Sequence, residues 1–207
     1  VMEFKITRKN IRTNPVPYYG MVKDSIGYLA LSSFTENSAK DFKKAFIELK
    51  QKGAKSLIID LRDNGGGSLS EAVDIVNLYV PKGQEIVVTK GKVRQAQGSY
   101  KTQNEPVDTQ IPLAVLVNGA TASASEIVSG SLQDLDRAVV IGSRTFGKGL
   151  VQTIRPLPYN GTLKVTTSKY YIPSGRCIQA IDYAKKNADG SVARTPDSLT
   201  TVFHTAA

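Results

Sequence analysis

The sequence predicts an α/β fold in which strand, loop and helix repeat along the chain. Three short apolar runs suit buried strands, and each is followed by a loop that contains glycine. Segments with helical spacing of apolar residues lie between them, which is typical of a mostly parallel sheet with helices packed on it. The composition, 41% apolar and 22% charged over 207 residues, is that of one globular domain. The runs are residues 56–61 (SLIIDL), 113–117 (LAVLV) and 138–141 (AVVI).

The first half of the chain contains two further strands and two helices. The pattern at residues 18–33 predicts two strands around a turn at 23–25. A helix is expected to follow, with Ser38 as its cap and Gly53 at its end. The next helix is expected to begin near Ser70 and to stop at Pro81, because its apolar residues keep helical spacing up to that proline.

The second half begins with a strand and ends with a β-hairpin. After the strand comes a polar stretch that we expect to be an excursion on the surface. A helix of small residues is expected between the last two apolar runs, and Asn-Gly predicts the turn of an appended hairpin. From Cys177 onward no strong periodicity is present. The ranges are 86–89 (strand), 91–109 (excursion), 121–132 (helix), 150–154 and 162–171 (hairpin around Asn160 and Gly161).

Composition excludes several kinds of chemistry. One cysteine, Cys177, and one histidine, His204, provide no internal disulfide and too few ligands for zinc, so we expect no metal and no cofactor. His204 lies three residues from the end, so acid–base catalysis is expected to use Lys, Asp, Glu or Tyr. The net charge of +9 comes from scattered basic residues without interleaved aromatics, so no nucleic-acid partner is expected. No apolar run reaches the roughly 18 residues of a membrane span.

The three glycine-containing loops are expected to lie together, because the carboxyl ends of parallel strands meet at one edge of a sheet. The first loop is DLRDNGGG, residues 60–67. Three successive glycines allow backbone N–H groups to approach a substrate and face developing negative charge. A flexible turn between a strand and a helix is the ordinary alternative for such a loop.

The second loop, NGATASASE at residues 118–126, places Ser123 and Ser125 at the start of a helix. Free N–H groups there can stabilise an anion, so a serine in this position suits a nucleophile. The ordinary alternative is a capping box formed by Ser123 with Glu126. That alternative leaves the run of small residues at 119–124 unexplained, since small side chains leave room for a substrate backbone.

The third loop, GSRTFGKG at residues 142–149, resembles a phosphate-binding loop but has Gly149 where that motif needs Ser or Thr. The following LVQTI alternates as a strand does, so a nucleotide-binding protein is a weak alternative. Lys148 would otherwise be a solvated surface lysine. With histidine effectively absent, a serine and a lysine can still form a hydrolytic pair, provided that burial lowers the pKa of the lysine. Ser123 and Lys148 are the candidates.

Four separated motifs resemble those of the C-terminal processing, or tail-specific, proteases. They are LRDNGGG (61–67), TASASE (121–126), FGKGLVQ (146–152) and YYIPSGRCIQ (170–179), and the likeness extends from about Asp24 to Gln179 in unchanged order. The resemblance implies a serine endopeptidase with a Ser-Lys pair on a crotonase-like α/β core. It makes Ser123 the nucleophile, Lys148 the base and Gln152 a residue that orients the lysine. It also implies an oxyanion hole of two backbone N–H groups, which we assign to Gly66 and Ala124.

The resemblance further implies a domain organisation and a setting. Residues 1–11 are expected to be the last strand of a PDZ domain, and residues 12–207 the protease core, truncated at its C-terminal end. The implied partners are proteins or peptides with accessible C-terminal tails, and a homo-oligomer is compatible with the family. The implied location is extracytoplasmic, in the bacterial periplasm or cell envelope. The alternative function is a catalytically idle peptide-binding core that requires the missing PDZ domain.

Overall fold

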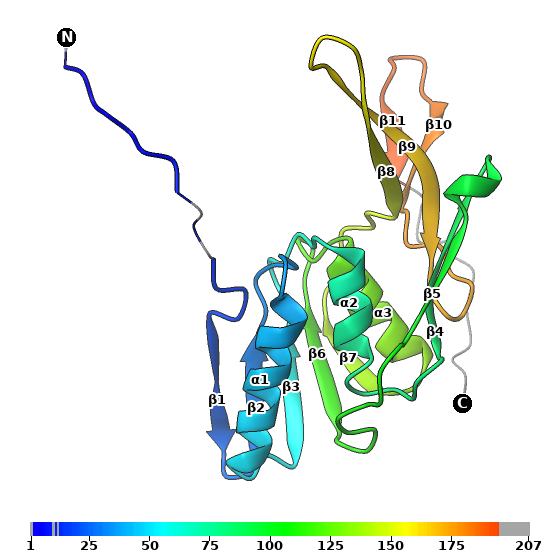
Figure 1. Ribbon diagram of the computed structural model, residues 1–207. Coiled ribbons are helices and arrows are strands. Elements are labelled where there is room, and N and C mark those ends of the chain that lie inside the picture. The colour runs from blue at the N-terminus through cyan, green and yellow to red at the C-terminus, as the bar shows by residue number, and fades with distance from the viewer. Residues whose placement is uncertain (1, 10, 12, 195–207) are drawn as a thin grey trace.

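The computed structural model describes residues 2–9, 11 and 13–194, and its centre is a five-stranded sheet with three helices on one face (Figure 1). β1 is antiparallel to β2, and the other neighbouring strands are parallel. The predicted α/β class is confirmed. In spatial order the strands are β1 (Tyr18–Lys23), β2 (Ile26–Ala30), β3 (Ser56–Asp60), β6 (Leu113–Val117) and β7 (Ala138–Gly142), and the helices are α1 (Ser38–Gln51), α2 (Leu69–Val76) and α3 (Ala124–Asp134).

A second, antiparallel sheet of four strands lies beyond α2 and α3, and its longest strands project away from the main sheet (Figure 1). Its order is β5 (Gly98–Lys101), β4 (Glu85–Gly91), β9 (Thr162–Tyr171) and β8 (Leu150–Pro156). The short helix η1 (Arg94–Ala96) and β5 lie within the stretch expected to be an excursion on the surface, where the sequence predicts no helix or strand. A separate pair, β10 (Ile181–Lys186) and β11 (Val192–Arg194), lies where no periodicity predicted a strand.

Two helix boundaries differ from prediction for local reasons. The cap of α1 is Asn37, with a left-handed φ of 69°, while Ser38 is the first helical residue. Asn tolerates this backbone region better than most residues, which explains the shift by one position. α2 ends at Val76, well before Pro81. The cause is Asn77, whose buried side chain bonds to the backbone of Gln103 and Asn104 and ties the helix end to the loop before β6.

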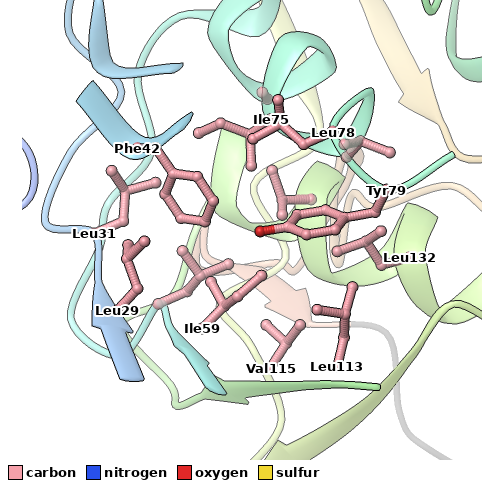
Figure 2. Packing of buried hydrophobic residues seen from close by; sticks show 14 of the residues in the cluster. Leu29, Leu31, Phe42, Ile59, Ile75, Leu78, Tyr79, Leu113, Val115 and Leu132 are labelled. Atoms are coloured by element: carbon pink, nitrogen blue, oxygen red, sulfur yellow. The ribbon is translucent and has the colours of Figure 1, made fainter. Parts of the chain in front are cut away.

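The hydrophobic core lies between the three helices and one face of the main sheet (Figure 2). Leu29, Ile59 and Val115 share a row across three strands and are fully buried. The three apolar runs were expected to be buried strands, and in β3 and β6 every residue is buried or half-buried. In β7, however, Val139 and Ile141 remain 65% and 51% exposed. An unbroken apolar run does not distinguish one covered face from two, so the prediction is wrong for β7.

Tyr79 lies fully buried in this core, and its hydroxyl has no hydrogen-bond partner among the described residues. Burial raises the pKa of this phenol well above its ordinary value. We expect Tyr79→Phe to raise the free energy of unfolding by about 1 kcal/mol, because it removes an unpaired buried polar group and leaves the ring packing. Urea unfolding measures the change. Tyr19→Phe is the control and should lower stability, since the Tyr19 hydroxyl donates to Glu48 over 2.6 Å; equal effects of the two changes would contradict the argument.

Both ends of the chain bear on the domain predictions. Residues 2–9 form no strand in the structure, although Met2, Phe4 and Ile6 alternate with polar residues and are exposed. A strand needs a partner to form its ladder, and none of the described strands pairs with this segment. His204 and the expected truncation lie outside the described residues. Within the described part of the chain, no helix is both long and apolar enough to span a membrane.

Candidate active site

The three glycine-containing loops meet at the carboxyl end of the parallel strands, as predicted. The N–H of Ala122, in the second loop, and the hydroxyl of Ser125, at the start of α3, both donate to the carbonyl of Asn64 in the first loop, each over 3.0 Å. The N–H of Phe146, in the third loop, donates to the carbonyl of Thr121 over 3.0 Å. The second loop therefore lies between the other two and contacts both.

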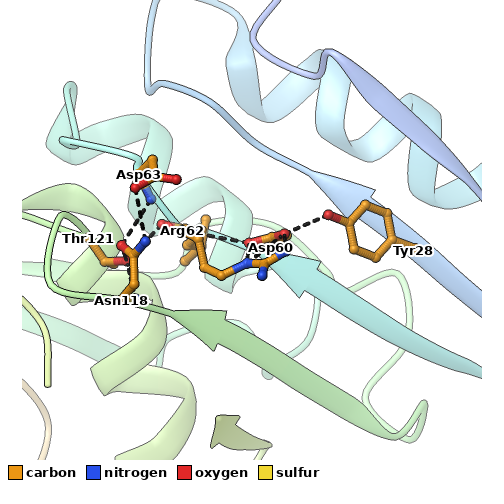
Figure 3. Close-up of polar contacts among 7 residues, drawn as sticks. Tyr28, Asp60, Arg62, Asp63, Asn118 and Thr121 are labelled. Carbon is orange, nitrogen blue, oxygen red and sulfur yellow. Dashed lines mark hydrogen bonds and ion pairs between the residues drawn. The ribbon is translucent and has the colours of Figure 1, made fainter. Parts of the chain in front are cut away.

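Side-chain hydrogen bonds hold the first part of the first loop, before its glycines (Figure 3). Asn118 exchanges two hydrogen bonds with Asp63, and the Thr121 hydroxyl donates to the carbonyl of Leu61 over 2.8 Å. Asn64 is fully buried, and its amide donates to the carbonyl of Leu31 over 2.7 Å. These contacts fix the backbone of the loop up to the glycines, and none of them was predicted from the residue pattern.

A cluster of charged and polar side chains lies at the end of β3, the strand that leads into this loop (Figure 3). It consists of Tyr28, Asp60 and Arg62. The Tyr28 hydroxyl donates to Asp60 over 2.5 Å, and the Arg62 guanidinium pairs with the same carboxylate over 2.6 Å. Burial opposes ionisation of Asp60, but the bonds from Arg62 and Tyr28 outweigh it and hold the pKa of Asp60 below its ordinary value. Burial and the bond to Asp60 raise the pKa of Tyr28.

This cluster predicts an acid-dependent loss of stability. The pKa of Asp60 is lower in the folded chain, so its contribution is fully present above the unfolded value of about 4 and is lost as pH falls through the folded value. Asp60→Asn is expected to lower the free energy of unfolding by about 1–2 kcal/mol at neutral pH and to flatten its fall below about pH 4. Urea unfolding against pH measures both effects. Asp24→Asn in the exposed turn after β1 is the control, and an equal response from it would contradict the assignment.

Ser123 occupies a sharp turn between the second loop and α3. Its φ of 59° and ψ of −115° are rare for a residue with a side chain, and such strain costs on the order of 1–3 kcal/mol. Strained turns of this kind, between a strand and a helix, present nucleophilic serines in other folds. The residue is half-buried, and it lies at the N-terminus of α3, where helix N–H groups favour negative charge.

Glu126 joins the serine turn to the lysine loop. Its side chain is buried, and its Oε2 accepts hydrogen bonds from the N–H groups of Ser123 and Lys148, each over 2.8 Å. Its Oε1 accepts from the Gly147 N–H over 2.6 Å and from the Thr145 hydroxyl over 2.7 Å. Because one oxygen serves both Ser123 and Lys148, their backbones are neighbours. The bond to Ser123 belongs to the capping box expected as the ordinary alternative, and the structure adds a second role that sequence spacing did not show.

Lys148 and Gln152 are placed differently from expectation. The Lys148 side chain is exposed, so the burial predicted for it is wrong for this structure. Its ammonium group makes no hydrogen bond or ion pair within the described part of the chain, and therefore none with Ser123. Gln152 is exposed on β8 and its side chain has no described hydrogen bond to the lysine. Gln179 is the glutamine that contacts this loop, since its Oε1 accepts from the Gly149 N–H over 2.8 Å.

The two predicted oxyanion donors also differ from each other. The Ala124 N–H has no hydrogen-bond partner among the described residues, so it is available to a substrate. The Gly66 N–H donates to Asn64 Oδ1 over 2.9 Å. Gly66 nevertheless lies directly beside the nucleophile, because a Cβ built on it would be 2.7 Å from Ser123 Cβ and 2.9 Å from Ala124 N. For Gly66 to bind an oxyanion, its N–H must leave Asn64.

Gly66→Ala is expected to remove activity by displacing Ser123. The φ of Gly66 is +95° and the added methyl group would collide with the Ser123 turn, so we expect a loss of about a hundredfold in turnover. Gly53→Ala is a matched control, since its φ is +91° but nothing lies within 4 Å of the new atom. Gly53→Ala should lose about 1 kcal/mol of stability through backbone strain, and Gly66→Ala should lose more because its methyl group also meets the backbone of Ala122 and Ala124. Assayed where both are folded, only Gly66→Ala should lose activity. Peptide hydrolysis and urea unfolding test this, and a fully active Gly66→Ala would contradict it.

Comparison with known proteins places most of the chain in one peptidase family. Residues 25–185 match peptidase family S41. The chain is 42% identical over 184 residues to the carboxy-terminal-processing protease of Bartonella bacilliformis, covering 87% of this chain and 42% of that protein. It is 32% identical over 209 residues to the chloroplastic C-terminal processing peptidase of Tetradesmus obliquus, covering 95% and 44%.

The fold also matches that of a solved structure. The photosystem II D1 C-terminal processing protease superposes with a TM-score of 0.72 at 33% identity, covering 84% of this chain and 47% of that one. The chain thus spans less than half the length of the relatives named here. The match over most of the chain, together with the resemblance carried by the three loops, shows that it belongs to peptidase family S41, among the serine-type C-terminal processing proteases.

Proposed function

We propose that the site is a Ser-Lys endopeptidase centre that cleaves proteins near their C-terminal tails. The observation that carries the proposal is the shared hydrogen bonding of Ser123 and Lys148 to one oxygen of Glu126, which makes their backbones neighbours. No histidine lies among the described residues, so a lysine is the base that this site offers. The relatives named as processing proteases support the same substrate class.

The mechanism begins with attack of Ser123 Oγ on the scissile carbonyl while neutral Lys148 takes the hydroxyl proton. The Ala124 N–H, with that of Gly66 once it leaves Asn64, donates to the oxyanion. Lys148 then passes the proton to the leaving amine, and the peptide bond breaks. Water, deprotonated by Lys148, hydrolyses the acyl-enzyme and releases the new carboxylate together with the serine hydroxyl.

Substrate binding supplies the missing step in this scheme. Lys148 is exposed here, so the free chain does not provide the dry surroundings that the scheme needs. A substrate chain laid over the third loop would cover the lysine and exclude water from it, which favours the neutral amine. We propose that Gln152, four residues on, turns to hydrogen-bond the Lys148 amine in that complex.

The proposed domain organisation, location and partners follow from the family resemblance. We propose that the main sheet is a crotonase-like core, with residues 12–207 as the protease domain and residues 1–11 as the end of a PDZ domain. The relatives are bacterial and chloroplast processing proteases, which supports an extracytoplasmic location in the periplasm or cell envelope. Protein tails are the proposed partners.

An acylating active-site probe tests the function directly. A fluorophosphonate should label the chain at Ser123, as located by mass spectrometry, and Ser123→Ala should remove the label. Lys148→Ala should also prevent labelling, while Lys55→Ala, an exposed lysine at the other end of the main sheet, should leave it unchanged. Labelling that survives Lys148→Ala would exclude Lys148 as the base. No labelling of the parent chain, with substrate peptides still bound, would favour the idle peptide-binding alternative.

A further inference from the structure

The second sheet carries most of the excess positive charge of the chain. The whole sequence has a net charge of +9. Residues 85–101 and 150–171, which contain the four strands of this sheet, have a single acidic residue, Glu85, and its carboxylate accepts a hydrogen bond from the Ser99 hydroxyl over 2.6 Å. Their basic residues are Lys90, Lys92, Arg94, Lys101, Arg155, Lys164 and Lys169.

Three of these lysines line one groove. It has a volume of about 470 Å³ and runs across β4, β9 and β8. Lys90 of β4 and Leu150 of β8 are both register partners of Lys169 in β9, so the three side chains form one row on the same face. We call this site the lysine groove, and its lining residues used below are Lys90, Lys92, Leu150, Thr167 and Lys169.

The lysine groove is electrostatically unfavourable on its own. Lys90 and Lys169 are directly opposite each other in an antiparallel pair, a position in which like charges destabilise a sheet. Neither these two nor Lys92 forms an ion pair with a described acidic residue. The Lys90 ammonium group lies 4.7 Å from the centre of the Tyr171 ring. A bound anion would offset this repulsion, because it would be attracted by three nearby ammonium groups.

The lysine groove also begins beside the proposed base. Leu150 lies two residues after Lys148, and the Tyr170 N–H, next to Lys169, donates to the carbonyl of Gly149 over 2.8 Å. Two residues of extended chain span about 7 Å. A peptide whose scissile carbonyl lies at Ser123 therefore reaches the lysine groove within about two to four residues.

We propose that the lysine groove is a subsite for acidic side chains of the substrate, two to four residues from the cleaved bond. The inference rests on the proposed peptidase function and adds a charge preference to it. A peptide is favoured over an anionic membrane because the three lysines lie at the end of the β8–β9 pair nearest Lys148. The tip of that pair, at residues 157–161, projects farthest from the core and carries no lysine or arginine (Figure 1).

The test measures binding without catalysis, so that failure of the function and failure of the subsite are distinct results. The chain with Ser123→Ala is titrated against a fluorescent peptide with two Glu residues and against its Gln analogue, and anisotropy gives Kd. We expect the Glu peptide to bind about tenfold more tightly, and the preference to shrink as salt rises from about 0.05 M to about 0.5 M. Adding Lys90→Gln and Lys169→Gln should abolish the preference.

Lys43→Gln with Lys55→Gln is the matched control, because both lysines are exposed and lie at α1 and before β3. This pair should keep the preference.

In the chain with Ser123 restored, the groove variants should raise KM for the Glu peptide and leave kcat unchanged. Equal Kd values for the two peptides, equal loss of both peptides in the groove variants, or an equal effect of the control pair would overturn the proposal. Lysine-dependent binding to phosphatidylserine vesicles without a Glu preference would also overturn it, in favour of a membrane contact. A Glu preference without any cleavage would keep the subsite and reject the peptidase.

Discussion

Ser123→Ala and Lys148→Ala are each expected to lower peptide cleavage by about 10⁴-fold or more, and the double variant is expected to lose no more than either single one. A serine without its base is not activated, and a base without the serine has no proton to accept, so the pair acts as one unit. The geometry supports this reading, because the two backbones share an acceptor on Glu126. The measurement is kcat/KM on a peptide substrate for all four chains.

Lys148→Arg provides the sharper variant of the same experiment. It keeps the positive charge and most of the length of the side chain, but a guanidinium stays protonated and cannot take the serine proton. We expect it to be as inactive as Lys148→Ala, whereas Lys55→Arg should be fully active. If Lys148→Arg retained turnover, or if the double variant were far worse than the singles, Lys148 would not be the base.

The elements with a clear period were predictable from sequence, and those that depend on pairing were not. α1 and the strands of the main sheet lie within a few residues of their predicted positions. β5 was missed because GSYK carries no alternating apolar pattern and becomes a strand only by pairing with β4. β10 and β11 likewise form a two-stranded sheet of short segments, in which each strand pairs with the other. The end of α2 depended on a buried side chain, Asn77, that binds a loop distant in sequence.

The sequence predicted which loops form the site, but only part of the contacts that their side chains and N–H groups make. The carboxyl ends of parallel strands meet at one edge of a sheet, so the convergence of the three loops followed from the order of the elements. Ser123 and Lys148 were candidates from their residue types, whereas Gly66 came only from the resemblance. Side-chain direction did not follow from the order of the elements. The exposure of Lys148 and the bond between Gly66 and Asn64 depend on which partner each group meets in three dimensions.

Glu126 was predicted only as the capping-box partner of Ser123. Its hydrogen bonds to the loop that contains Lys148 were not predicted, because a helix cap already accounted for the residue. Its two carboxyl oxygens accept hydrogen bonds from four donors. Glu126→Gln replaces one oxygen with an NH₂ group, so two of those donors would face another donor in a buried place. We expect a loss of about 2–4 kcal/mol in the free energy of unfolding.

The activity of Glu126→Gln should fall further than its stability explains, by about a hundredfold or more, because the Ser123 turn and the Lys148 loop lose the acceptor that they share. Glu71→Gln is the matched control. Glu71 also binds backbone N–H groups of another segment, those of Asn37 and Ala39, and ties α1 to α2 away from the serine. Both variants should unfold at lower urea, but Glu71→Gln should keep kcat/KM when assayed where it is folded. If Glu126→Gln kept the activity of Glu71→Gln under those conditions, the carboxylate would be a helix cap alone, and the neighbouring positions of Ser123 and Lys148 would need another cause.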